Sequence, residues 1–153
     1  MELILWRHCD AEPGVPDELR ALTPRGRAEA ARMAEWLRDR LPAACRIFVS
    51  PAVRARQTAE ALGLPYETRP DVAPGASVGD VLRVAGWPDA AVTTLVVGHE
   101  PTLGRVAAHL LHEAGERPLA KGGVVWLASR PLDADGAEST IVAETSPQSL
   151  ARS

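Results

Sequence analysis

Short apolar runs alternate with amphipathic segments along this chain, and the alternation indicates which elements it forms. Residues 2–6 contain no polar residue after Glu2, which is typical of a strand buried on both faces of a parallel sheet. Comparable runs predict five further strands, at 46–49, 66–69, 93–97, 123–128 and 139–144. Apolar spacing and capping residues predict helices at about 24–40, 51–62, 77–85 and 101–114.

Two of these helices begin with an N-cap residue followed by proline, Thr23-Pro24 and Ser50-Pro51, and we expect Thr23 and Ser50 to act only as caps. Because strands alternate with helices, we expect a three-layer α/β/α fold with a mostly parallel central sheet. The last strands can add one antiparallel edge strand to it. We expect a single domain over residues 1–146 and a frayed tail over residues 147–153.

The charge, hydropathy and cysteine content of the chain argue against nucleic acid as a partner and against a membrane or secreted location. The chain has 153 residues and a net charge of −3, so it lacks a basic field that would attract nucleic acid. No apolar run approaches the roughly 20 residues that cross a bilayer, and the first residues lack the pattern of a signal peptide. Two cysteines, Cys9 and Cys45, cannot form a disulfide framework, which favours a cytoplasmic protein. The oligomeric state stays open, and a monomer is compatible with the sequence.

Three of the predicted strands end at residues that can carry chemistry. Arg7 and His8 follow the first strand, His99 follows the strand at 93–97, and Arg54 follows the strand at 46–49 by about one helical turn. The carboxyl ends of parallel strands open on the same edge of a sheet, where ligands bind. We therefore expect two imidazoles and two guanidiniums around one pocket, which suits a dianionic phosphate.

The expected geometry supports nucleophilic catalysis at phosphorus. A neutral His8 can attack a phosphoryl group and form a covalent phosphohistidine intermediate, which water then hydrolyses. Arg7 and Arg54 would stabilise the charge on the phosphoryl oxygens, and His99 would donate to them as an imidazolium. This chemistry requires no metal and no cofactor. Each residue alone has a simpler structural explanation, such as a histidine bonded to neighbouring backbone.

The same residues carry a family resemblance. Arg7-His8, the segment Ser50-Pro51-Ala52-Val53-Arg54-Ala55-Arg56-Gln57-Thr58 and Gly98-His99-Glu100-Pro101 together resemble the motifs of the histidine phosphatase (phosphoglycerate-mutase-like) superfamily. With its short length and with 22–26 opening the first helix, the chain is most similar to the SixA-type phosphohistidine phosphatases. The resemblance, over about residues 2–111, implies that His8 is the nucleophile. It also implies that Arg7 and Arg54 bind phosphate and that His99 is the second histidine.

Two departures from the family pattern bear on the chemistry. Cys9 stands where the family has glycine or alanine, and its thiol could tighten the pocket or make the site sensitive to oxidation. The glutamate proton donor of larger members has no counterpart here, and Asp10, Glu12 or Glu100 could replace it. An imidazole leaving group, with a conjugate-acid pKa of about 6.5, needs little protonation, so the missing acid favours protein phosphohistidine as the substrate.

Three alternatives stay open at this point. A small-molecule phosphomonoesterase could use the same residues on a small phosphomonoester, and a phosphoprotein-binding module could keep the pocket and lose turnover. A metallohydrolase could use His8, His99 and Asp10. His109 and His112 share one side of a predicted helix but fall off its apolar face, so we expect them to be solvated rather than metal-binding.

Overall fold

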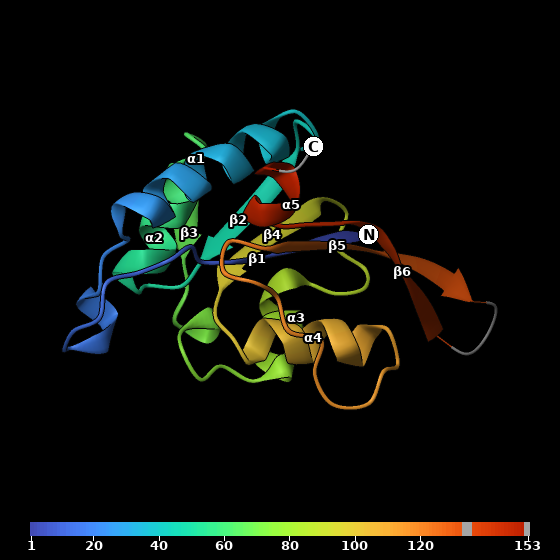
Figure 1. Cartoon of the computed structure of the whole chain (residues 1–153). Coiled ribbons are helices and arrows are strands. Elements are labelled where there is room, and N and C mark those ends of the chain that lie inside the picture. The colour runs from blue at the N-terminus through green and yellow to red at the C-terminus, as the bar shows by residue number, and fades with distance from the viewer. Residues whose placement is uncertain (133–135, 152–153) are drawn as a thin grey trace.

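The computed structural model describes residues 1–132 and 136–151, in which a six-stranded sheet lies between two layers of helices (Figure 1). In chain order the strands are β1 (Glu2–Arg7), β2 (Cys45–Val49), β3 (Glu67–Thr68), β4 (Thr93–Gly98), β5 (Val124–Leu132) and β6 (Gly136–Thr145). The residues Asp-Ala-Asp-Gly at 133–136 predict a turn between the last two strands, and residues 133–135 of this segment lie outside the described residues.

The spatial order of the strands is β3-β2-β4-β1-β5-β6. β3, β2, β4 and β1 run parallel to one another, β5 is antiparallel to β1, and β6 is antiparallel to β5. In the register, Arg7 of β1 lies opposite Gly98 of β4, and Val49 of β2 lies opposite Val97. The carboxyl ends of these three strands therefore end side by side, and the predicted mixed α/β fold with an antiparallel edge is confirmed.

Helices cover both faces of the sheet (Figure 1). They are α1 (Pro24–Arg38), α2 (Val53–Glu60), α3 (Val78–Ala85), α4 (Thr102–Leu110) and α5 (Pro147–Ala151), with short 3-10 turns η1 (Asp17–Leu19) and η2 (Pro70–Val72). α1, α2 and α5 lie on one face, and α3 and α4 lie on the other. Within the described residues, none of these helices combines the length and apolarity needed to cross a membrane.

Alternation along β1 divides the core between the two faces. Ile4 and Trp6 pack with α1 and α2, whereas Leu3 and Leu5 pack with α3 and α4, and all four side chains are fully buried. This double burial explains why the strand reads as a continuous apolar run.

The predicted frayed tail is wrong for residues 147–151, which form α5 beside α1. Ser146 Oγ accepts a hydrogen bond from the Ser149 N–H at 3.2 Å, and Pro147 is buried in the first position of the helix. Arg32 of α1 also donates to the Pro147 carbonyl at 3.3 Å. A cap residue followed by proline thus starts this helix, as it does at Thr23-Pro24.

The start of α1 is held tightly against the chain that follows β1. Thr23 Oγ accepts from the Gly26 N–H at 2.9 Å and donates to the Asp10 carboxylate at 2.8 Å. Gly26 is buried so close to this segment that a Cβ atom added there would overlap the carbonyl oxygen of Asp10. The glycine therefore lets α1 approach the segment that contains His8.

We predict that Gly26→Ala lowers the free energy of unfolding by about 1–3 kcal/mol, because the added methyl group must displace α1 from the Asp10 backbone. Gly79→Ala is the matched control, since Gly79 is also in the first turn of a helix but an added Cβ there has no contact closer than 3.8 Å. That change should be neutral or stabilising by at most about 1 kcal/mol. Urea unfolding measures both. Equal effects of the two substitutions would contradict the close-approach explanation.

Candidate active site

The carboxyl ends of β1 and β4 and the first turn of α2 bring three buried side chains together. The ring centroids of His8 and His99 are 5.1 Å apart, with an angle of 54° between the ring planes. The Nε of Arg54 lies 3.3 Å from His8 Nε2. These groups come from positions 46 and 91 residues beyond His8 along the chain, and the structure joins them in one cluster.

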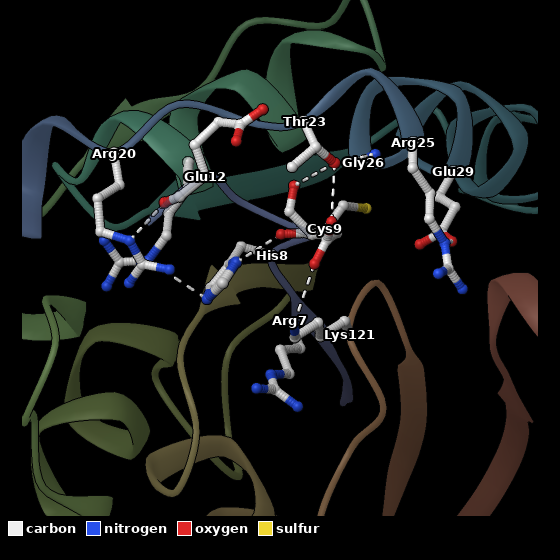
Figure 2. A network of polar contacts seen from close by, with 12 residues as sticks. Arg7, His8, Cys9, Glu12, Arg20, Thr23, Arg25, Gly26, Glu29 and Lys121 are labelled. Atoms are coloured by element: carbon white, nitrogen blue, oxygen red, sulfur yellow. Dashed lines mark hydrogen bonds and ion pairs between the residues drawn. The ribbon is translucent and has the colours of Figure 1, made fainter. Parts of the chain in front are cut away.

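The hydrogen bonds of His8 define its tautomer (Figure 2). Its Nδ1 is 2.8 Å from the Cys9 carbonyl oxygen, which can only accept, so Nδ1 carries the proton. Arg54 Nε–H can only donate, so Nε2 is the acceptor of that contact. The lone pair of Nε2 therefore points toward the guanidinium of Arg54, where an anion would be held.

His8 is also kept neutral by its surroundings. Burial lowers its pKa to about 4, and the positive charges of Arg54 and Arg7 act in the same direction. The hydrogen bond to the Cys9 carbonyl opposes this shift without cancelling it. At neutral pH Nε2 therefore carries no proton, and its lone pair, which accepts the hydrogen bond from Arg54, can attack an electrophile that replaces that contact.

His99 differs from the sequence prediction in its charge. Burial, together with the nearby His8 and Arg54, lowers the pKa of His99 to about 3, so it is neutral rather than the expected imidazolium. Its Nε2 lies 2.7 Å from Ser50 Oγ, and its buried Nδ1 has no hydrogen-bond partner among the described residues. A buried donor or acceptor without a partner is costly, which makes this atom a candidate contact for a ligand.

Ser50 does not cap α2, contrary to the sequence prediction. The N-cap position is Ala52, and α2 begins at Val53. Ser50 Oγ instead accepts from the Ala52 N–H at 3.2 Å and contacts His99. The hydroxyl thus connects the end of β2 to the imidazole at the end of β4.

Arg7 lies in the same region and is fixed at one end. Its Nη1 donates to the Leu119 carbonyl at 2.9 Å, and its buried Nε has no partner among the described residues. Burial lowers the pKa of Arg7, and the negative charge of Glu100 opposes that shift. The structure therefore leaves Arg7 with donors that a phosphate could take.

Asp17 and Arg20 are site residues that the sequence did not identify. Arg54 Nη1 donates to the Asp17 carbonyl at 2.8 Å and Nη2 donates to its carboxylate at 3.0 Å. Arg20 donates to the other carboxylate oxygen at 3.0 Å, and its charge lowers the pKa of His8. The composition of the loop after β1 shows only that it is polar. Nothing in its sequence indicates that it contacts α2.

The three candidate acids differ in their surroundings. Hydrogen bonds from Lys121 and Thr23 lower the pKa of Asp10, which disfavours its acid form. Burial raises the pKa of Glu100, although its carboxylate accepts from the Gly104 N–H at 2.8 Å and so caps α4. Glu12 is exposed and contributes its backbone carbonyl to a 2.7 Å hydrogen bond from Arg20. Burial thus favours the acid form of Glu100, but the hydrogen bond from Gly104 ties its carboxylate to the start of α4.

The surroundings of Cys9 argue against the sensitivity to oxidation that the sequence allows. Its side chain is fully buried, and burial raises its pKa to about 12, so the reactive thiolate does not form near neutral pH. Its backbone N–H donates to Thr58 Oγ at 3.1 Å, which ties the segment after His8 to α2.

Known proteins are similar to this chain in sequence and in fold. Residues 3–75 match the model of the histidine phosphatase superfamily (branch 1). An uncharacterized protein of Mycobacterium tuberculosis is 39% identical over 107 residues, covering 67% of this chain and 66%, just under two thirds, of that protein. Phosphohistidine phosphatase SixA of Escherichia coli is 35% identical over 130 residues, covering 77% and 78%. A solved structure of the protein histidine phosphatase SixA complexed with tungstate is 30% identical, with a TM-score of 0.78 and coverage of 98% and 99%.

The two neutral histidines predict how stability depends on pH. Their folded-state pKa values, about 4 for His8 and about 3 for His99, lie below the unfolded value of 6.5, so the unfolded chain binds more protons in between. The stabilisation is fully present above pH 6.5 and is lost as the pH falls through this window. In urea unfolding at about pH 7 and about pH 5, His8→Asn should therefore lose less stability than the wild type. An equal loss in the two proteins would mean that His8 is not held neutral.

Proposed function

Because this chain belongs to the histidine phosphatase superfamily, we propose that it is a phosphatase that hydrolyses phosphohistidine on a protein. The reaction proceeds through a covalent intermediate on His8 and uses no metal or cofactor. The observation that carries the proposal is the orientation of His8, whose neutral Nε2 lone pair meets the Arg54 guanidinium at 3.3 Å. A nucleophile and an anion-binding group are thus held side by side.

In the first step His8 Nε2 attacks the phosphorus atom. The bond from Nε2 to phosphorus forms as the bond to the leaving nitrogen of the substrate breaks. That nitrogen keeps the electron pair, and the group leaves as neutral imidazole because its other ring nitrogen carries a proton. Arg7 and Arg54 donate to the phosphoryl oxygens and stabilise the charge that builds up on them. Because Nδ1 of His8 keeps its hydrogen bond to the Cys9 carbonyl, the ring does not turn during the attack.

His99 acts as a further donor to the phosphoryl group. Ser50 Oγ already accepts from the Ala52 N–H, so its own proton is available to His99 Nε2 at 2.7 Å. We propose that Ser50 donates this contact, so that the proton of the neutral imidazole lies on Nδ1, the atom that has no partner among the described residues. A phosphate oxygen would satisfy this N–H, and the negative phosphate would raise the pKa of His99.

In the second step a water molecule hydrolyses the phosphoenzyme. Its oxygen bonds to phosphorus, the bond to His8 Nε2 breaks, and the imidazole recovers its lone pair. The water proton leaves with inorganic phosphate or is accepted by a neighbouring base. Neutral imidazole, with a conjugate-acid pKa of about 6.5, is a good leaving group in this step.

The acid-poor site favours phosphohistidine over phosphomonoesters. An alkoxide must be protonated as it leaves, whereas an imidazole with a conjugate-acid pKa of about 6.5 leaves with little help. Asp10 is held ionised by Lys121 and Thr23, and the carboxylate of Glu100 caps α4. The same contacts of Asp10 argue against its joining the two histidines in a metal site. We keep the cytoplasm as the expected location and a phosphorylated protein as the expected partner.

Trapping the phosphoenzyme tests this proposal. We expect that a peptide with radiolabelled phosphohistidine, mixed with enzyme and quenched rapidly, leaves an acid-labile, base-stable label on the wild type. His8→Ala should carry no label, whereas His109→Ala, which changes an exposed histidine on α4, should be labelled like the wild type. Label on His8→Ala would place the nucleophile elsewhere.

Steady-state rates distinguish the alternatives. Arg54→Ala should lower kcat/KM by about 100-fold or more, because it removes a donor to the charged transition state. We expect a higher kcat/KM for the phosphohistidine peptide than for sugar phosphates, and the reverse order would favour a small-molecule phosphomonoesterase. Tight binding of the peptide with neither label nor phosphate release would favour a phosphoprotein-binding module.

A further inference from the structure

The guanidinium of Arg54 is held by a residue of the loop between β1 and α1. Both of its terminal nitrogens donate to Asp17, Nη1 to the backbone carbonyl at 2.8 Å and Nη2 to the carboxylate at 3.0 Å. The third nitrogen, Nε, donates to His8 Nε2 at 3.3 Å. A buried cation, 6% exposed in its side chain, is thus fixed on two sides by groups from different elements.

Because a guanidinium is planar, contacts on one of its edges fix the orientation of the other edge. Its five N–H donors lie in one plane, so fixing the edge formed by the two terminal nitrogens also fixes the edge that contains Nε. In Arg54 the first edge is occupied by Asp17 and the second faces His8. The edge that faces the nucleophile is the one that can bind phosphoryl oxygens during attack.

We propose that Asp17 is a positioning residue for phosphoryl transfer, acting through Arg54 by turning the Nε edge of its guanidinium toward the phosphoryl group on His8. This inference rests on the proposed function. Asp17 does not itself contact the phosphate, since its carboxylate is occupied by Arg54 and Arg20. Arg20 completes the arrangement, because its Nε is anchored to the Glu12 carbonyl at 2.7 Å and its Nη1 holds Asp17.

The negative charge of Asp17 allows a positioning role to be distinguished from a purely electrostatic one. A carboxylate beside a phosphate pocket repels the substrate, so its removal should improve anion binding if charge were its only effect. A positioning role predicts the opposite sign. The two effects of Asp17 can therefore be separated by the direction in which activity changes.

The test compares three variants. Asp17→Ala removes the carboxylate contact, and Asp17→Asn keeps a neutral acceptor for Arg54 Nη2. Glu18→Gln is the matched control, because it removes the neighbouring negative charge of η1 from an exposed side chain with no hydrogen bond or ion pair among the described residues. The readouts are kcat and KM on the phosphohistidine peptide, the affinity for tungstate by calorimetry, and the NMR signal of the Arg54 Nε–H group.

We expect Asp17→Ala to lower kcat by about 10- to 100-fold, as for loss of a charge-assisted contact that holds a catalytic group. KM should change less than kcat, Asp17→Asn should recover part of the loss, and Glu18→Gln should match the wild type. The Arg54 Nε–H signal should broaden in Asp17→Ala, and tungstate should bind more weakly. In an Arg54→Lys background, where one nitrogen replaces the planar fork, Asp17→Ala should have a smaller effect.

Two results would overturn the proposal. Tighter tungstate binding with unchanged or higher kcat in Asp17→Ala would mean that Asp17 competes with phosphate for Arg54. An equal loss in the wild-type and Arg54→Lys backgrounds would mean that Asp17 supports the loop alone. If the wild type has no phosphatase activity, the proposed function fails, while tungstate affinity and the Arg54 signal still decide the role of Asp17.

Discussion

Two hydrogen bonds on opposite sides of the His8 imidazole are the constraint on which the site depends. The Cys9 carbonyl accepts from Nδ1 at 2.8 Å, and Arg54 donates to Nε2 at 3.3 Å. The first contact is local and is set by the chain leaving β1. The second requires β4 to pair with both β1 and β2, so that α2, which follows β2, reaches the end of β1. The nucleophile is therefore oriented only when the parallel part of the sheet is complete.

Burial gives these side chains their reactivity and also makes the cluster costly to assemble. Desolvation lowers the pKa of both imidazoles, and the buried charge of Arg54 is balanced by Asp17 from the loop after β1. A bound phosphate would add negative charge at the centre and raise the pKa of His99. The imidazolium expected from the sequence is thus a state that substrate binding would favour, not the resting state.

Local signals in the sequence predicted the strands and the edge at which His8, Arg54 and His99 meet, because burial on both faces and parallel topology leave few alternatives. Contacts between distant segments could not be predicted. The Arg54–Asp17 pair joins residues that are 37 positions apart in the sequence, and Ser50 contacts His99, which is 49 positions away. The Ser50-Pro51 pair is also typical of a helix cap, so the sequence did not indicate the contact with His99. In contrast, α5 begins with a cap residue followed by proline, Ser146-Pro147, as α1 begins with Thr23-Pro24. The sequence therefore carried a signal for α5, but the helix is short and polar, and the prediction for this segment was a frayed tail.

The tautomer and charge of His8 at neutral pH decide whether its Nε2 can act as the nucleophile. Nitrogen-15 NMR of the histidine rings, with the His8 signals assigned by comparison with His8→Asn, reports which ring nitrogen carries the proton. We predict that at neutral pH Nδ1 is protonated and Nε2 is bare, and that this pattern persists until the pH approaches the lowered pKa of about 4. A proton on Nε2 at neutral pH, or an imidazolium already formed there, would mean that Nε2 is not available as the nucleophile.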